Sequence, residues 1–277
     1  MNFFFDSGLP RSGSTLLSAI LNQNRVIYAP PLSPVMTAMM TTRDWFECSE
    51  NVKAFDQPEA QHNAVSGIFK SFYKSKTGFH IIDKSRLWVG HIDFIKKYIN
   101  PFPKIICTVR DPLEILASFI RLIHRSGSNN SFVDRLLIEK KMSITDDNRC
   151  TMLMLGVVGE SLKALQTAYI RNQMRHVHLI DYNDLVVDKP NQTMVDLYNF
   201  LGIEYFEHDF DNISHDLREN DNIYGLPEMH SVRSTLSYEP SHYADVLSVN
   251  IINKYQDLNF WKGDSDVLSS PSIQSVG

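Results

Sequence analysis

The 277-residue sequence is poor in cysteine, has no basic excess and contains no long apolar run. Its three cysteines, Cys48, Cys107 and Cys150, are odd in number and widely spaced, which excludes a disulfide framework and a cysteine zinc site. A formal net charge of -5 argues against a general nucleic-acid binder. No stretch approaches the roughly 20 apolar residues that cross a membrane. Because the first strand begins within two residues of Met1, there is no room for a signal peptide, and we predict a cytoplasmic protein.

The apolar segments that are present alternate between strand-like and helix-like patterns. Strands are predicted at 3–7, 26–28, 80–82, 104–109 and 177–180. Helices are predicted at 14–24, 35–46, 58–74, 88–98 and 147–173, with one further helix that begins at Pro112 and another that ends at Gly202. This alternation predicts an α/β fold, a P-loop-type three-layer sandwich with a central, mostly parallel sheet flanked by helices.

The last third of the chain departs from this alternation. Residues 203–242 read as polar loop, and one amphipathic helical segment follows at 243–261. With no repeat and no linker in sequence, we predict a single domain over 1–262 and a flexible tail over 263–277.

One short motif, "GLPRSGST" at 8–15, follows the first predicted strand. It fits the phosphate-loop pattern G-x-x-x-x-G-K-[ST] except that Ser14 replaces the lysine. Gly8 and Gly13 allow a tight turn before a helix whose N-terminus attracts anions, so the motif predicts an anion site. The missing lysine disfavours ATP or GTP, and Arg11 is the only cation of the loop. A strand–turn–helix joint without a ligand is the alternative interpretation.

Further charged and aromatic side chains follow other predicted strands. Lys84 comes after the strand at 80–82, Arg110 after 104–109 and Tyr182 after 177–180, while Ser118 stands eight residues beyond Arg110. Ligands of such sheets bind beyond the carboxyl ends of the strands. Each of these residues alone could be an ordinary surface residue. Together with the loop they indicate a ligand that carries two anionic groups and one flat ring.

These stretches resemble the sulfotransferases that use 3′-phosphoadenosine 5′-phosphosulfate (PAPS), especially tyrosylprotein sulfotransferases and related bacterial or viral enzymes. "GLPRSGSTLLSAIL" is similar to their 5′-phosphosulfate loop, and "KIICTVRDPLEILASFIR" to their 3′-phosphate motif. "IIDKSR" contains the position of their catalytic lysine, and "LIDYNDLVVDKPNQTMVDLYNFLGI" is similar to the segment with an adenine-side tyrosine. The resemblance spans residues 3 to about 203.

The resemblance implies PAPS as the donor, without a metal ion, and Lys84 and Arg11 as catalytic residues. Arg233, in the late stretch "GLPEMHSVRSTL", would be a further clamp on the 3′-phosphate, with a plain solvated loop as the alternative. The donor-binding residues implied are Arg11, Ser12, Gly13, Ser14, Thr15, Arg110, Ser118, Tyr182 and Arg233.

The catalytic base departs from the family pattern. Tyrosylprotein sulfotransferases have a glutamate where this chain has Leu32 in "YAPPLSPVM". The remaining candidates for a base are Asp83, His91, Glu47 and Asp44.

The motifs do not identify the acceptor, which could be a small molecule, a glycan or a peptide. The sequence gives no signal for the oligomeric state. His176 and His178 face one side of a strand but lack a third ligand, so no metal site is predicted. A non-catalytic domain that binds the desulfated nucleotide and a small-molecule kinase are the alternative functions.

Overall fold

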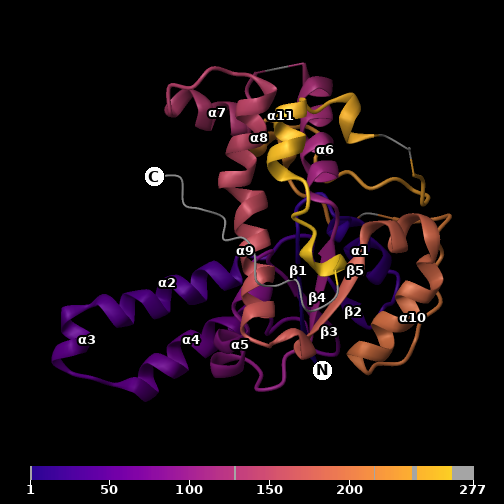
Figure 1. Cartoon of the computed structure of the whole chain (residues 1–277). Helices are drawn as coiled ribbons and strands as arrows, with labels where there is room; N and C mark the ends of the chain where they lie inside the picture. Colours follow the sequence, from indigo (N-terminus) through magenta and orange to yellow (C-terminus); the bar gives the residue numbers. More distant parts are fainter. Residues whose placement is uncertain (1, 128, 215, 239–241, 264–277) are drawn as a thin grey trace.

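The computed structural model describes residues 2–127, 129–214, 216–238 and 242–263 (Figure 1). Five strands form one sheet in the order β2-β3-β1-β4-β5, and every pair is parallel. The predicted α/β fold is confirmed, and the described sheet is parallel throughout. The strands are β1 (Phe3–Gly8), β2 (Ile27–Tyr28), β3 (His80–Lys84), β4 (Ile105–Val109) and β5 (Val177–Asp181).

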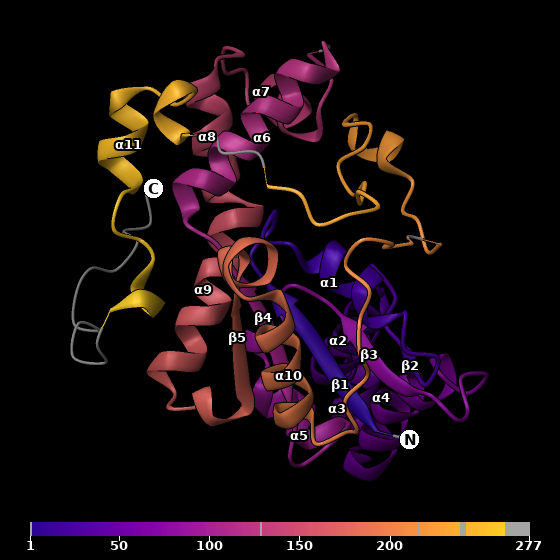
Figure 2. The ribbon, with the colours of Figure 1, turned by 90° about the vertical axis from the view of Figure 1, so that its right-hand side faces the viewer.

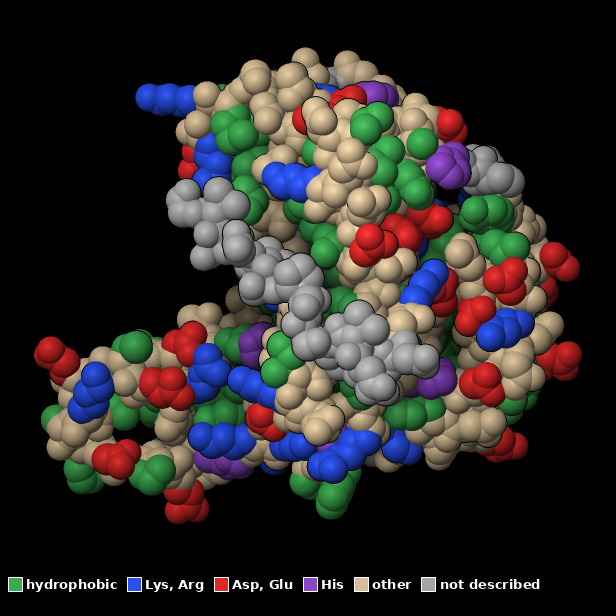
Figure 3. Space-filling model, viewed as in Figure 1, with side chains coloured by type: hydrophobic (Ala, Val, Ile, Leu, Met, Phe, Trp, Pro, Cys, Tyr) green, Lys and Arg blue, Asp and Glu red, His purple; other side chains and the backbone are tan. Residues whose placement is uncertain are grey.

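Helices cover both faces of this sheet, with α1 and α10 on one side and α9 on the other (Figures 1 and 2). Helices α2, α3 and α4 form an arm that projects from the body of the molecule (Figures 1 and 3). The helices are α1 (Ser14–Leu21), α2 (Val35–Cys48), α3 (Glu50–Ala54), α4 (Pro58–Phe72), α5 (Ile92–Tyr98), α6 (Pro112–Ser126), α7 (Phe132–Glu139), α8 (Asp146–Leu155), α9 (Val157–Ile170), α10 (Pro190–Leu201) and α11 (Val249–Tyr255).

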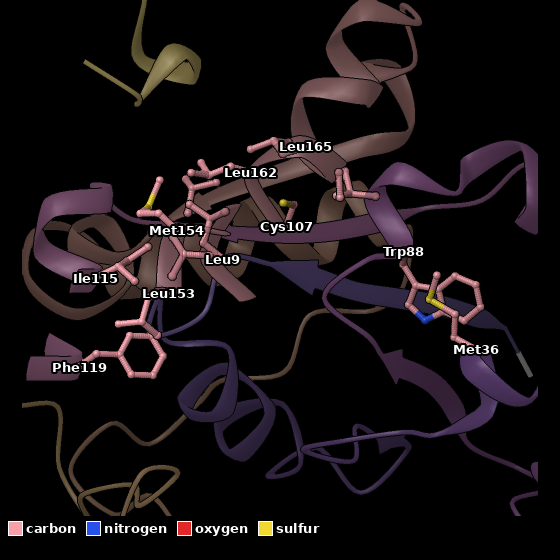
Figure 4. Close-up of a cluster of buried hydrophobic side chains, with 14 of the residues drawn as sticks. Leu9, Met36, Trp88, Cys107, Ile115, Phe119, Leu153, Met154, Leu162 and Leu165 are labelled. Carbon is pink, nitrogen blue, oxygen red and sulfur yellow. The ribbon is translucent and has the colours of Figure 1, made fainter. Parts of the chain in front are cut away.

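Alternate strand residues enter two separate hydrophobic clusters, because successive side chains of a strand point to opposite faces. Phe5 and Cys107 belong to the larger cluster, which also contains Trp88 and the apolar faces of α6, α8 and α9 (Figure 4). Phe4 and Ile106 belong to the smaller cluster, under α1 and α10. The sheet is therefore buried on both faces, and only the ends of its strands are open to a ligand.

Three predicted helices are interrupted. The helix predicted at 88–98 divides at His91 into a 3₁₀ turn at Trp88–Gly90 and α5. The helix predicted at 147–173 breaks at Gly156, whose φ of -109° and ψ of -122° leave the helical region, so that α8 and α9 are separate. The close approach of Gly159 to Met154 fixes this break, since a Cβ at Gly159 would lie 1.9 Å from the carbonyl oxygen of Met154. The segment 243–261 is helical only in α11, with short 3₁₀ turns at Tyr243–Asp245 and Phe260–Lys262.

Two other predictions concern the chain as a whole. Apart from Gly263, the predicted tail lies outside the described residues, and the single domain over 1–262 stays a prediction. Among the helices of the described ranges, none has both the length and the hydropathy needed to span a membrane.

Gly8 ends β1 in a conformation that excludes a side chain. Its φ is +133°, and a Cβ would lie 2.4 Å from the carbonyl oxygen of Thr108, which accepts a hydrogen bond from the backbone N–H of Leu9. We expect Gly8→Ala to lower the free energy of unfolding by about 2 kcal/mol or more, measured by urea denaturation. Gly67→Ala is the control, since a Cβ there meets open space on α4 and stability should stay equal or rise. Equal stability of both variants would contradict this interpretation of the turn.

Candidate active site

A cavity of about 550 Å³ opens at the carboxyl edge of the sheet, a size within the range of small-molecule sites. The segment after α10 runs beside α1 toward this edge (Figure 2). Beyond the far end of α1, Gln23 accepts a hydrogen bond from the N–H of Asp209 in this segment. Residues 219, 228–233 and 235–238 of that segment form one wall of the cavity. The predicted site residues that line it are Arg11, Gly13, Ser14, Thr15, Lys84, Arg110, Ser118, Tyr182 and Arg233.

The loop between β1 and α1 presents free backbone N–H groups to the cavity. Gly13 is the N-cap of α1 with φ +88°, and the first helical hydrogen bond runs from the N–H of Leu17 to Gly13. None of the described hydrogen bonds uses the N–H groups of Ser14, Thr15 or Leu16, and the first turn of α1 contains no acidic residue. These donors and the helix dipole suit an anionic oxygen group.

Ser12, the remaining predicted member of the donor site, does not line the cavity. Its side chain is fully buried, and its hydroxyl donates to the carbonyl oxygen of Leu9 at 2.5 Å and lies 2.7 Å from the Thr108 hydroxyl. The side chain of Ser12 therefore fixes the loop against β4.

Arg11 and Arg110 approach each other on the β4 side of the loop. Arg11 Nε donates to the Ser118 hydroxyl at 3.2 Å, and Arg110 donates to the carbonyl oxygen of Arg11 at 3.2 Å. The Arg110 guanidinium also stacks on the Tyr182 ring at 4.1 Å and pairs with Glu114 at 3.0 Å. Burial, reinforced by Arg110, lowers the pKa of Arg11 to about 10, so the Arg11 guanidinium stays charged at neutral pH. Two cations beside a flat ring suit a phosphorylated nucleoside.

Lys84, at the end of β3, brings a cation to the loop that lacks its own lysine. The side chain is buried, with 8% of its surface exposed, and its ammonium donates to the Thr15 hydroxyl at 3.3 Å. Burial lowers the pKa of Lys84, while the carboxylates of Asp6 and Glu219 oppose that shift. A neighbouring strand thus supplies the charge that the sequence motif omits.

None of the four base candidates from the sequence lines the cavity. Asp83 points to the opposite face of the sheet from Lys84, where it accepts hydrogen bonds from the Tyr73 hydroxyl and, at 2.6 Å, from Trp88 Nε1. Asp44 and Glu47 form ion pairs with Arg43 on the arm. His91 Nδ1 lies 2.9 Å from the carbonyl oxygen of Leu87.

The late segment instead places a histidine and two carboxylates beside Lys84. His230 lines the cavity, and its Nδ1 lies 2.6 Å from Asp221 Oδ1 and 3.4 Å from Glu219 Oε2. No described residue forms a hydrogen bond with its Nε2. Burial, with Lys84 and Arg86, lowers the pKa of His230, and Asp221 opposes that shift. The arrangement fixes an imidazole whose Nε2 is available to accept a proton.

A long-range hydrogen bond joins this segment to the donor loop. Arg11 Nη1 donates to the carbonyl oxygen of Met229, which directly precedes His230. The sequence patterns did not predict that His230, Asp221 and Glu219 belong to the site. The only local signal is a histidine in a Gly- and Pro-containing loop, because the spacing of the three residues follows no helical or strand period.

His176 and His178, considered above for a metal, have other contacts. His176 Nδ1 lies 3.1 Å from the carbonyl oxygen of Pro103, and the His178 ring stacks on Phe200. Within the part of the chain that the structure describes, no three His, Cys, Asp or Glu side chains are grouped closely enough to hold a metal ion.

The sheet order defines a P-loop-type α/β protein, and its cavity at the carboxyl edge of the sheet is lined by Arg11, Lys84 and Arg110. Residues 4–207 match the model of the sulfotransferase family, and the chain belongs to that family. No curated protein matched the sequence.

Several solved structures show a distant likeness. The sulfotransferase domain from the curacin biosynthetic pathway is 18% identical, with a TM-score of 0.48, 88% of this chain and 82% of that chain covered. The sulfotransferase domain of the Synechococcus PCC 7002 olefin synthase is 18% identical, with a TM-score of 0.44 and coverage of 99% and 89%. The sulfotransferase STF9 from Mycobacterium avium is 14% identical, with a TM-score of 0.46 and coverage of 92% and 76%.

Proposed function

We propose that this protein transfers a sulfuryl group from PAPS to a hydroxyl or amine of an acceptor. The observation that carries the proposal is the pairing of two cationic sites in one cavity: the α1 N-terminus with Lys84, and Arg11 with Arg110 and Ser118. Tyr182 provides a ring surface beside the second site. Family membership gives the chemistry of the donor that such a cavity would take.

Each group has a role that follows from its position. The N–H groups of Ser12, Gly13 and Ser14 and the Ser14 and Thr15 hydroxyls would hold the 5′-phosphosulfate. Arg110 and Ser118 would hold the 3′-phosphate, with Arg233 as a further contact. PAPS supplies an activated sulfuryl group. Lys84 and Arg11 would stabilise negative charge as that group moves, which is electrostatic catalysis by fixed cations.

His230 is the group best placed to remove the acceptor proton. Donation from its Nδ1–H to Asp221 would leave Nε2 unprotonated and orient the ring toward the cavity. Leu32, where the family glutamate is expected, also lines this cavity, so a base from the late segment would replace one from the second strand. The acceptor stays open among small molecules, glycans and peptides.

The first experiment is thermal unfolding with 3′-phosphoadenosine 5′-phosphate (PAP), compared with ATP plus magnesium. A ligand at a hundredfold its dissociation constant stabilises by about 2.7 kcal/mol, and we expect that stabilisation with PAP. Arg110→Ala should weaken PAP binding by about 10- to 100-fold, because a charged hydrogen bond is lost. Arg171→Ala is the control, since Arg171 pairs with Asp93 at an exposed position.

Three results would contradict the proposal. Stabilisation by ATP and magnesium alone would favour a kinase, and no stabilisation by either nucleotide would exclude a donor site of this kind. Tight PAP binding without turnover on any acceptor would favour a non-catalytic nucleotide-binding domain.

A further inference from the structure

A buried carboxylate, Asp6, lies beside Lys84 and has no role in the transfer step described above. Asp6 and Lys84 are direct neighbours in the register of β1 and β3, so their side chains share the face of the sheet that α1 covers. Asp6 is only 3% exposed, and its Oδ1 has no hydrogen-bond partner among the described residues. A buried carboxyl oxygen without a donor is costly and calls for an explanation.

The charges around this pair come from every neighbouring element. Burial raises the pKa of Asp6 to about 7, with Asp83 adding to the shift and Lys84 opposing it. On β4, Asp6 is in register with the apolar Ile106, and the thiol of the next residue, Cys107, is neutral because burial raises its pKa. Lys84 in turn faces Asp6, Glu219 and Arg86, and His230 lies within range of its charge. Asp6 exerts the largest opposing effect on the lowered pKa of Lys84.

We propose that Asp6 couples donor binding to proton uptake. In the free protein Asp6 is the counter-ion of Lys84, and it accepts one proton from a buffer acid when the anionic donor takes over the Lys84 ammonium. The inference rests on the proposed function. Asp6 would be a positioning residue that acts through Lys84, not a group that contacts the donor.

The physical reason is that one ammonium cannot neutralise two anions in a buried site. A phosphosulfate at the α1 N-terminus would add negative charge close to Asp6, which disfavours an ionised carboxylate. Protonation of Asp6 removes that repulsion and leaves the whole charge of Lys84 to the donor. Because the pKa of Asp6 in the free protein is about 7, donor affinity should be full below that pH and decrease as the pH rises above it.

The test is isothermal titration calorimetry of the full chain with PAP at pH 8, in two buffers with different enthalpies of ionisation. At this pH Asp6 is about nine-tenths ionised in the free protein, and the PAP phosphates, with a second pKa of about 6, contribute little to proton exchange. We expect an uptake between one half and one proton per PAP. In Asp6→Asn the uptake should fall close to zero, and PAP affinity should become nearly independent of pH between 7 and 9.

Glu219→Gln is the matched control, because Glu219 is the other carboxylate that faces Lys84, and the proton uptake should persist in that variant. Uptake that persists or grows in Asp6→Asn would assign the proton to Lys84 and overturn the inference, and loss of uptake only in Glu219→Gln would reassign it to Glu219. PAP binding to the wild type without proton uptake would overturn this inference but leave the proposed function standing. Failure of PAP to bind the wild type would overturn the proposed function as well.

A second measurement does not depend on the folding of the variant. The infrared difference spectrum of PAP binding to the wild-type protein should show a new carboxylic-acid C=O band. Absence of that band at pH 8 would contradict protonation of a buried carboxylate.

Discussion

Replacing Lys84 by alanine is expected to lower kcat by about 10²- to 10³-fold, while PAP binds within about tenfold of the wild type. The ammonium lies at the Thr15 hydroxyl, at the N-terminus of α1, where charge would develop during transfer of the sulfuryl group. The PAP phosphates retain the α1 N-terminus, Arg11 and Arg110, so that most of the ground-state binding remains. Steady-state rates with PAPS and an identified acceptor, together with PAP titration, measure the two effects separately.

The control for this variant is Lys104→Ala, which removes a partly buried lysine at the other end of the sheet, where its ammonium donates to the carbonyl oxygen of Leu201. Its kcat should not change. Thermal unfolding of both variants separates a lost charge from a lost fold. A kcat of Lys84→Ala equal to the wild type would exclude Lys84 from the transfer step.

The neighbouring residues Asp83 and Lys84 show what strand geometry could have added to the sequence prediction. Both follow the apolar stretch of β3, and the sequence offered both as site residues. Successive residues of a strand point to opposite faces, so only one of them can reach a given cavity. Burial of Asp83 against Tyr73 and Trp88 follows directly from that alternation.

The strands and the donor loop were predictable because their signals are local. The apolar run of β1 and the glycines at 8 and 13 act within a few residues, and the family motifs repeat that local information. The break between α8 and α9 was not predictable in this way, because the apolar pattern continues through Gly156. It depends on how closely Gly159 approaches Met154.

The late segment could not be placed from sequence at all. It has no periodic pattern, and its position depends on contacts between residues far apart in the sequence, such as Arg11 with Met229, 218 residues away, and Arg135 with Ile223. Side chains that lie beside the donor loop only through such a contact leave no signal in the spacing of residues. This is why the candidate base was sought near Leu32 and among Asp83, His91, Glu47 and Asp44, and not in 219–230.

Replacing His230 by glutamine is expected to lower kcat/KM by about 10²- to 10⁴-fold, because the acceptor would lose its general base. In the wild type, activity should fall as the pH drops through the pKa of His230, which burial places below its usual value near 6.5. Asp221 opposes that shift, so Asp221→Asn should move the acid limb of the pH–rate profile to still lower pH and reduce the rate at neutral pH. The pH dependence of kcat/KM for the three proteins measures this directly.

His178→Gln is the control, since His178 stacks on Phe200 outside the cavity and its loss should leave the acid limb in place. Glu219 offers the sharpest contrast, because it lies 3.4 Å from His230 Nδ1 and faces the same cations. Burial raises the pKa of Glu219, and Asp221 adds to that shift, so a glutamate base would also give an acid limb that moves to lower pH in Asp221→Asn. The single substitutions of His230 and Glu219 therefore separate the two bases. Full activity of His230→Gln, combined with a loss in Glu219→Gln, would transfer the role of base to Glu219.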